Sequence, residues 1–327
     1  MPTRRLRWRG FGIEVEVPDR AVRTMRGLIG ERKPHRAHDA PDDLELADTV
    51  PALRLEHPDQ ARERFMRELH ATLELYPDGW SGPPPAADEE LAEQIRRLPW
   101  YHTLELPGGV VTPGFYDHRP LVPHYGIPRD LSGKRVLDVG TWDGFWAFEF
   151  ERRGAEVVAV DIDRMSQTDL PPQLRAAALE AGLDQRLGNG FEIARRAMDS
   201  KVQRIGMSVY DIDTGGIGTF DLVHMADVAI HLERPLEAFR RLRSVARGSA
   251  IIVDAFHPDL GYGAERKVTE YRGGWKDVQW WIPSLDTLAQ MVLDAGFGDV
   301  RVHRIYRLDL RGRPGSGQWR AILVANA

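Results

Sequence analysis

The fold is decided by residues 136–144, which read VLDVGTWDG. An apolar run passes directly into a turn that contains Gly140 and Gly144, and a helix-forming run over residues 145–153 follows it. Glycine lets the backbone pass close to a ligand because it has no side chain, and the first turn of a helix offers unpaired N–H donors. This order of strand, glycine turn and helix predicts a nucleotide-binding loop.

Acidic residues follow the neighbouring strands at matching places. Asp138 ends the first strand, where it can hold the loop or the amine of a ligand, and Asp161 ends the next strand, predicted over residues 156–160. A carboxylate at that second place can accept both hydroxyls of a ribose. Asp211, with Tyr210 beside it, follows a third predicted strand and is expected to reach the edge of an adenine. Thr141, Trp142 and Ile162 complete the predicted contacts.

The residues of the loop indicate which kind of nucleotide it binds. A pyrophosphate-binding turn prefers Gly-x-Gly-x-x-Gly, whereas Trp142 stands at the middle position here and Asp143 adds a negative charge. A cationic sulfonium with an amino-acid tail suits this loop better, because nearby carboxylates attract it. A turn made only for structure is the alternative, but the ordered strand, turn, helix, strand and acid favour the nucleotide site.

Strands alternate with helices from Leu131 onward. Strands are predicted at 135–139, 156–160, 204–209, 220–225 and 250–253, and helices at 145–153, 235–245 and 285–295. Two late strands, 300–305 and 320–325, flank a Gly/Pro-rich loop at 311–317, which favours an antiparallel edge pair. The pattern predicts an α/β, Rossmann-like sheet of seven mostly parallel strands with an antiparallel last strand.

Three regions are expected along the chain. Residues 1–97 form an accessory or cap region, with a strand at 11–17, a helix at 59–76 and a proline-rich break at 78–87. Residues 98–130 form an aromatic lid segment of short strands and loops. Residues 131–327 form the nucleotide-binding domain, with an insert at about 258–284.

Composition limits the classes of function. The 327 residues carry a formal net charge of −5, which does not favour a nucleic-acid binder, and they include no cysteine, which excludes disulfides and thiolate metal sites. No apolar run is long enough to span a bilayer, so we expect a cytoplasmic protein without a membrane partner. The accessory region allows a homodimer.

Residues 136–144 with Asp161 resemble motif I and its acidic partner in class I S-adenosylmethionine methyltransferases, and the late strand pair resembles the reversed final strand of that fold. Trp142 departs from the glycine that is usual in the motif. The resemblance implies S-adenosylmethionine as cofactor.

A narrower resemblance covers about residues 98–297. Pro99-Trp100, residues 109–114, and His231 followed by Pro235 resemble the bacterial tRNA wobble-uridine carboxymethyltransferases and their methyltransferase relatives. In that family a Lys after the Pro-Trp pair and a Tyr before the His hold the extra carboxylate of carboxy-S-adenosylmethionine. His102 and Ile230 stand there, and an isoleucine cannot bind a carboxylate, which implies ordinary S-adenosylmethionine.

Methyl transfer is an in-line displacement that depends mainly on alignment, and a base helps only when the acceptor must lose a proton. His231 is the first candidate base, with capping of the following helix as the structural alternative. Asp227 and His102 are further catalytic candidates, whereas His224 inside an apolar strand is more typical of a packed side chain. Tyr101, in the lid segment, is a candidate cofactor contact.

The loop after the fifth strand was weighed as a metal site. Asp254, His257 and Asp259 lie close in sequence, but the turn composition that follows favours solvated acids, and no metal is expected. Trp275, Trp280 and Trp281 in the insert either wall an acceptor pocket or cover the sheet edge.

The function expected is methyl transfer to a small-molecule acceptor in a biosynthetic pathway. An RNA methyltransferase is the first alternative, motivated by the tRNA-enzyme resemblance and by N-terminal arginines that are interleaved with acids: Arg4, Arg5, Arg7, Arg9, Arg20, Arg23 and Arg26. A cofactor-binding protein without catalysis is the second alternative. The loop chemistry disfavours a nicotinamide oxidoreductase.

Overall fold

The computed structural model describes residues 3–8, 13–18, 89–172, 175–176, 179, 184, 186–260, 267–273 and 279–327, with residues 3–8, 13–18 and 313–316 described for the backbone alone. The predicted helix at 59–76, the predicted break at 78–87 and Trp275 lie outside the described residues.

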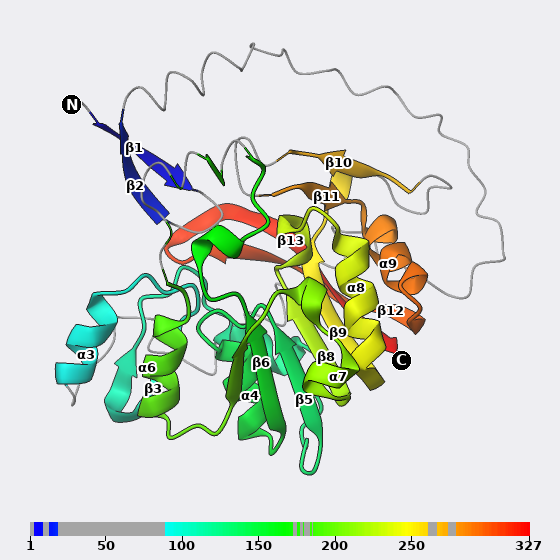
Figure 1. The fold of residues 1–327 in the computed structure, drawn as a ribbon, viewed down its shortest axis with the longest axis horizontal. Coiled ribbons are helices and arrows are strands. Elements are labelled where there is room, and N and C mark those ends of the chain that lie inside the picture. The colour runs from blue at the N-terminus through cyan, green and yellow to red at the C-terminus, as the bar shows by residue number, and fades with distance from the viewer. Residues whose placement is uncertain are drawn as a thin grey trace.

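A seven-stranded sheet forms the centre of the molecule (Figure 1), with the strand order β12-β13-β9-β8-β5-β6-β7. The strands from β5 to β9 pair in parallel, whereas β13 pairs antiparallel with both β9 and β12. This confirms the predicted fold class. The bounds are β5 (Arg135–Val139), β6 (Glu156–Asp161), β7 (Gln203–Gly206), β8 (Phe220–Ala226), β9 (Ala246–Ala255), β12 (Gly298–Leu310) and β13 (Arg313–Asn326).

Helices cover both faces of the sheet, which explains why its central strands are mostly apolar. Successive residues of a strand point to opposite faces, so Val136 packs in one buried cluster and Leu137 in the other. Helices α4 (Phe145–Arg152) and α6 (Asn189–Ala197) contribute to the first cluster, and α8 (Pro235–Val245) and α9 (Leu285–Asp294) contribute to the second.

The lid segment consists of short pieces, as expected. It contains β3 (Glu105–Leu106), η1 (Pro107–Gly109), β4 (Val110–Val111) and η2 (Arg119–His124), and it follows helix α3 (Glu89–Arg96). The remaining short elements are η3 (Met165–Gln167), η4 (Val209–Asp211), α7 (Thr214–Ile217), η5 (Ala229–His231), η6 (Pro258–Leu260), β10 (Thr269–Tyr271) and β11 (Trp281–Pro283). In the accessory region, β1 (Thr3–Trp8) pairs antiparallel with β2 (Ile13–Pro18), which includes most of the strand predicted at 11–17.

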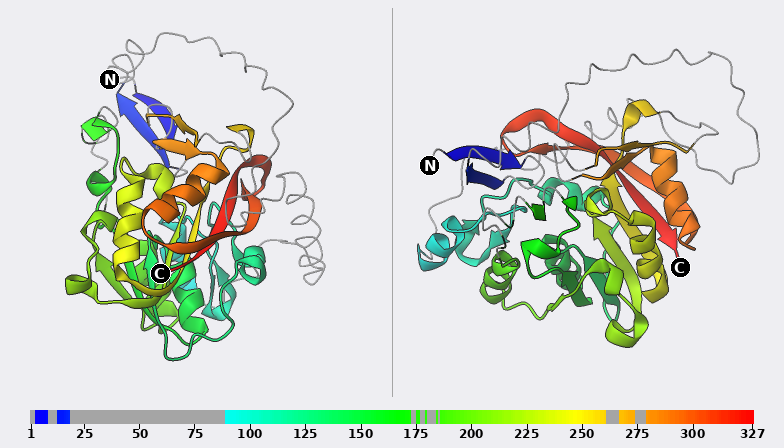
Figure 2. Two further views of the ribbon diagram at one scale, coloured as in Figure 1. Left: turned by 90° about the vertical axis from the view of Figure 1, so that its right-hand side faces the viewer. Right: turned by 45° about the horizontal axis from the view of Figure 1, so that its top comes forward.

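Two sequence predictions need correction. The loop predicted at 311–317 is a turn at Arg311 and Gly312, because β13 already begins at Arg313, and the two late strands form one long curved ribbon pair (Figure 2). The third strand ends at Gly206 instead of Val209, because Ser208 accepts a hydrogen bond from the Tyr210 N–H and starts the 3₁₀ turn η4. No helix among the described residues is long and apolar enough to cross a membrane.

Candidate functional site

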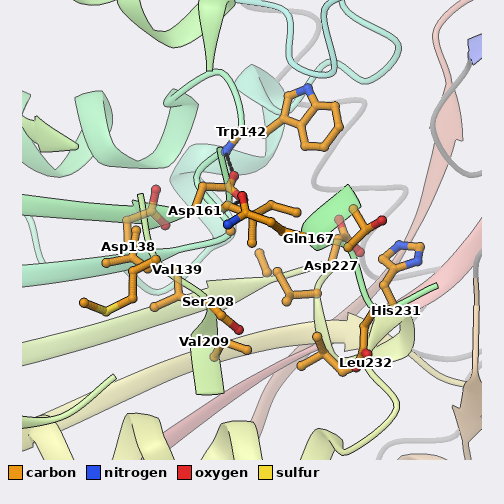
Figure 3. Close-up of a pocket in the computed structure, with 18 of the residues that line it drawn as sticks. Asp138, Val139, Trp142, Asp161, Gln167, Ser208, Val209, Asp227, His231 and Leu232 are labelled. Carbon is orange, nitrogen blue, oxygen red and sulfur yellow. Dashed lines mark hydrogen bonds between the residues drawn. The ribbon is translucent and has the colours of Figure 1, made fainter. Parts of the chain in front are cut away.

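A cavity opens at the carboxyl ends of β5, β6 and β8, the edge at which parallel α/β sheets bind ligands. Side chains from these three strand ends and from η5 surround it (Figure 3), and the lid segment contributes Tyr101 and His102 to its lining. Of the predicted contacts, the lining includes Tyr101, His102, Asp138, Gly140, Trp142, Asp161, Ile162, Tyr210, Asp227 and His231.

The turn after β5 needs its glycines for backbone and packing reasons. Gly140 has φ of 75°, and a Cβ there would lie 2.3 Å from Cγ2 of Val228. Gly144 has φ of 88° and precedes α4, and a Cβ there would lie 2.5 Å from the ring of Phe148. Both positions therefore exclude any larger residue.

Trp142 adopts the left-handed backbone conformation that a glycine would favour at this position, with φ of 48°. Its N–H donates to Oδ2 of Asp161 at 2.7 Å, as Figure 3 shows. This hydrogen bond offsets part of the strain, and the departure from the usual glycine leaves the left-handed turn in place.

Asp161 lies at the end of β6, and its two carboxylate oxygens accept hydrogen bonds from the N–H groups of Trp142 and Ile162, at 2.7 Å and 2.8 Å. Burial raises the pKa of Asp161 to about 6, against the lowering effect of the Trp142 bond and the Arg204 charge. Each oxygen keeps acceptor capacity for a ligand hydroxyl.

Asp138 is 2% exposed, and its oxygens have different surroundings. Oδ1 bonds Nδ1 of His224 at 2.6 Å, whereas Oδ2 is buried and has no hydrogen-bond partner among the residues that the structure describes. His224, expected to be a packed side chain, is buried within β8 and also lines the cavity. Its Nε2 lies 3.0 Å from the Tyr125 hydroxyl.

Asp143 fastens the lid segment to the loop. Its Oδ2 accepts hydrogen bonds from the backbone N–H groups of Tyr101, at 2.6 Å, and His102, at 3.0 Å. The side chain is 3% exposed, and burial raises its pKa to about 7. The sequence identified this charge as unfavourable for a phosphate, and the structure gives it a second role, holding Tyr101 over the cavity.

Asp227 is already paired. Its Oδ1 accepts from Nε of Arg320 at 2.6 Å, and its Oδ2 accepts from the Tyr101 hydroxyl at 3.4 Å. Burial opposes the charge of Arg320, but Asp227 raises the pKa of Arg320 above its usual value. These contacts indicate that Asp227 shapes the cavity wall. Sequence reasoning missed Arg320, whose signal was an arginine beside the apolar run AILVA.

The two other catalytic candidates, His231 and His102, lie in different surroundings. His231 lies in η5, and in Figure 3 it stands on the same side of the cavity as Asp227 and Leu232. His102 is 4% exposed, and burial, followed by the neighbouring His118 and His224, lowers its pKa well below the usual value. His102 is therefore a neutral and weak base, and His231 is the better candidate.

Residues 165–171, which we call the strap, run beside the cavity, and Gln167, Thr168, Asp169 and Leu170 line it. Oδ2 of Asp169 accepts from the Tyr210 hydroxyl and the Glu233 N–H, both at 2.6 Å, and the Asp169 carbonyl accepts from the indole of Trp280. The strap thus joins three separate parts of the chain. No sequence motif pointed to it.

Three predicted contacts lie outside the lining. Thr141 is buried within the turn, and Gly144 supports the start of α4. Asp211 is exposed at the end of η4 and lies outside the lining, whereas Ser208, just beyond the early end of β7, is part of the lining. The expectation that Asp211 reaches an adenine edge stays a prediction.

The residues weighed for a metal are engaged elsewhere. Asp254 is buried and accepts from the N–H groups of Ala229 and Ala255, and no group of three or more His, Cys, Asp or Glu able to hold a metal occurs among the described residues. Trp280 and Trp281 lie outside the lining, and their indoles donate to the carbonyls of Asp169 and Glu233. They anchor the insert.

Comparison with known families supplies the assignment. A family model described as "Methyltransferase domain" matches residues 116–302, more than half of the chain. The chain belongs to this methyltransferase-domain family. Its sheet order and reversed strand β13 are those of the class I fold.

Curated relatives match parts of this methyltransferase domain. The magnesium-protoporphyrin O-methyltransferase of Rhodobacter capsulatus is 47% identical over 53 residues, 15% of this chain and 24% of that protein. The tRNA U34 carboxymethyltransferase of Pseudomonas putida is 25% identical over 175 residues, 53% of this chain and 48% of that protein. The chain thus spans half or less of the curated relatives it matches.

Solved structures resemble the methyltransferase domain at low identity. The N-terminal domain of EvdMO1 with SAH bound has a TM-score of 0.47 and 16% identity, covering 74% of this chain and 98% of that one. Magnesium protoporphyrin IX methyltransferase from Synechocystis with bound SAM has a TM-score of 0.39 and 16% identity, covering 85% and 99%.

Proposed function

We propose that the protein is an S-adenosylmethionine-dependent methyltransferase that acts on a small-molecule acceptor. One observation carries the proposal: Asp138, in the methyltransferase motif at the end of β5, presents a buried and unpartnered carboxylate oxygen in a lined cavity. A buried acceptor of this kind calls for a donor from a ligand, and the α-ammonium of the cofactor is one with the matching charge.

The charges of the lining agree with a cationic guest. Four carboxylates line the cavity, those of Asp138, Asp161, Asp169 and Asp227. Among the described residues of the lining, Arg234 is the one Lys or Arg, and it is paired with Glu237 and stacks over the Tyr210 ring at 4.2 Å. An ammonium and a sulfonium fit this wall, whereas a pyrophosphate would be repelled.

The residues present supply the other parts of the cofactor site. Asp161 would accept the ribose hydroxyls, and the bare backbone at Gly140 permits close approach. Ile162, Ser208 and Val209 provide a mixed apolar and polar wall for an adenine ring. The carboxylates of the lining would repel an additional carboxylate on the cofactor, which favours the ordinary cofactor over its carboxylated form.

The main contribution of the protein to methyl transfer would be to align the acceptor atom with the methyl group of the cofactor. The bound cofactor supplies a methyl group on a positively charged sulfur, and the acceptor atom displaces that sulfur in line. Tyr101 and strap residues line the cavity, and with a cofactor bound they would hold it against the walls that impose the alignment. His231 would take the proton that a hydroxyl acceptor loses.

The acceptor class follows from the enclosure and charge of the cavity. Its walls include the aromatic side chains of Tyr101 and Trp146, and its carboxylates do not attract a phosphate backbone. We therefore favour a small acceptor over RNA, and we infer a cytoplasmic enzyme of a biosynthetic pathway.

Titration calorimetry with S-adenosylhomocysteine tests the proposal. The parent protein should bind it, and Asp161→Asn should weaken binding by about 1.5–3 kcal/mol, because the ribose hydroxyls lose a charged acceptor. Asp211→Asn, outside the lining, is the matched control and should leave affinity unchanged. NAD should not bind. Absence of heat with S-adenosylhomocysteine would refute the proposal, and labelled methyl transfer to an acceptor panel separates an enzyme from a binding protein.

A further inference from the structure

We propose that His224, fixed by Tyr125, is a positioning residue that orients Asp138 so that the cavity selects ligands with a free α-ammonium group. The inference rests on the proposed function and deepens it, because it assigns recognition of the amino-acid tail to a buried trio: Tyr125, His224 and Asp138.

The trio occupies the middle of the sheet. Asp138 on β5 and His224 on β8 are register partners, and they are 2% and 1% exposed. The flanking pairs in the same two strands are Leu137 with Val223 and Val139 with Met225, all apolar. Burying a polar pair there costs desolvation energy that an apolar pair would avoid, so the sheet by itself gives no reason for the pair.

The hydrogen bonds fix the histidine tautomer. Oδ1 of Asp138 can only accept, so Nδ1 of His224, 2.6 Å away, carries the proton. Nε2 is then an acceptor, and it receives the hydroxyl of Tyr125 at 3.0 Å. Burial raises the pKa of Tyr125 well above its usual value, so the phenol stays protonated and remains a donor.

Tyr125 is itself immobilised. It is 0% exposed and stacks on Trp146, with ring centroids 3.8 Å apart and an interplanar angle of 23°. His224 also contacts the ring of Phe150 edge-on. The imidazole therefore has little freedom to turn, and it holds the Asp138 carboxylate in one rotamer.

The consequence appears at the other carboxylate oxygen. With Oδ1 committed to His224, Oδ2 of Asp138 is left buried and unpartnered beside the cavity. Asp161 differs, because both of its oxygens already accept a backbone N–H. A ligand that lacks an ammonium group would leave Oδ2 of Asp138 without a hydrogen-bond donor. Loss of the ammonium group should therefore lower the binding affinity more than a change at the ribose does.

The test compares two ligands that share the nucleoside and differ in the tail. S-adenosylhomocysteine carries the ammonium, and 5′-methylthioadenosine lacks the whole amino-acid tail. The parent should prefer S-adenosylhomocysteine. His224→Leu should lower the affinity for S-adenosylhomocysteine at least tenfold and change the affinity for 5′-methylthioadenosine less than threefold. His224→Asn, whose amide N–H can replace Nδ1–H, should retain most of the preference, and Tyr125→Phe should lose part of it.

A purely structural role for His224 predicts a different result, equal loss of affinity for both ligands. That outcome, or an unchanged preference in His224→Leu, overturns the inference and leaves the proposed function intact. If His224→Leu does not fold by circular dichroism, the preference measured in Tyr125→Phe decides the question. A parent that binds neither ligand refutes the proposed function together with this inference.

Discussion

At the scale of single residues, the carboxylates of the cavity differ in what they still offer a ligand. Asp227 is ion-paired with Arg320, and Asp161 is hydrogen-bonded to the loop backbone. Asp138 keeps one buried oxygen without a partner. Under the proposed function, residues of one type at similar strand ends would serve as wall, sugar acceptor and ammonium acceptor, and their local hydrogen bonds would make the difference.

Gly140→Ala should reduce both stability and cofactor affinity. The new Cβ would lie 2.3 Å from Val228 at a φ of 75°, so we expect a loss on the order of 2–4 kcal/mol from strain and overpacking. Gly133→Ala is the control, because Gly133 has φ of 70° but no atom within 4 Å of a Cβ. Gly133→Ala should lose about 1 kcal/mol of unfolding free energy and keep the affinity of the parent for the cofactor. Urea unfolding and calorimetry measure both, and equal losses in the two variants would contradict the packing argument.

His231→Ala should lower turnover about a hundredfold or more for a hydroxyl acceptor, because the base that removes the proton is gone. Affinity for S-adenosylhomocysteine should stay within threefold of the parent. Single-turnover methyl transfer and calorimetry separate the two effects. Parent-level turnover in the variant would give His231 a structural role only.

The sequence predicted much of the cavity at this scale and missed what depends on long-range contacts. Asp138, Gly140 and Asp161 follow from a local motif, and each lines the cavity. Arg320 lies 93 positions from its partner Asp227, so no spacing rule connects them. Whether the chosen cofactor contacts and catalytic residues act as proposed stays a prediction.

At the scale of elements, the strap and the lid segment enclose the cavity through one aspartate each. Asp169→Asn should loosen the strap, because an amide is a weaker acceptor for the Tyr210 hydroxyl and the Glu233 N–H. We expect S-adenosylhomocysteine to dissociate about 5–20 times faster in stopped-flow experiments, which corresponds to a loss of about 1–2 kcal/mol of binding free energy. Asp163→Asn, on an exposed side chain paired with Arg204 outside the lining, should leave that rate unchanged.

The lid anchor Asp143 predicts a pH effect on stability. The pKa of Asp143 is raised from 3.8 to about 7 by burial, so the folded protein holds a proton that the unfolded chain has lost. The contribution of this group to stability therefore falls as pH rises from about 4 to 7 and is lowest above 7. Asp143→Asn keeps an oxygen for both N–H donors and never ionises.

Thermal unfolding should show this variant gaining stability relative to the parent as pH goes from 5 to 8. Asp221→Asn is the control, because hydrogen bonds from Arg247 and the Arg135 N–H lower the pKa of Asp221 to about 2. Both its folded and unfolded states are ionised between pH 5 and 8, so its effect should be constant there. A pH-independent difference for Asp143→Asn would contradict the assigned burial effect.

Elements with clear periodicity were predicted closely, and those held by tertiary contacts were not. Strand β5 and helix α8 have the predicted bounds, because an apolar run or an apolar helical face marks each. Helix α6 was missed, since only Gly190, Phe191 and Ala194 are buried on it and few of its other residues are apolar. Strand β13 includes Arg313, Gly315 and Gly317, which read locally as a loop but pair with β12 over part of that stretch.

At the scale of the whole molecule, charge separates the two acceptor classes. The net charge of −5 and a carboxylate-rich cavity predict that bulk tRNA binds weakly at 50 mM salt and without a steep salt dependence. Filter binding across 50–200 mM salt measures this. A decrease in affinity of a thousandfold or more over that range would favour the RNA methyltransferase and count against the small acceptor.

The interior place of β13 also constrains the order of folding. Because β13 lies between β9 and β12, strand β12 has no neighbouring strand in the sheet until β13 is in place. Arg320 belongs to β13, so the ion pair between Arg320 and Asp227 forms only when that strand has joined the sheet. The cavity wall at Asp227 is therefore completed only when this strand joins the sheet. A chain that lacks β13 in the sheet does not yet present the whole cavity.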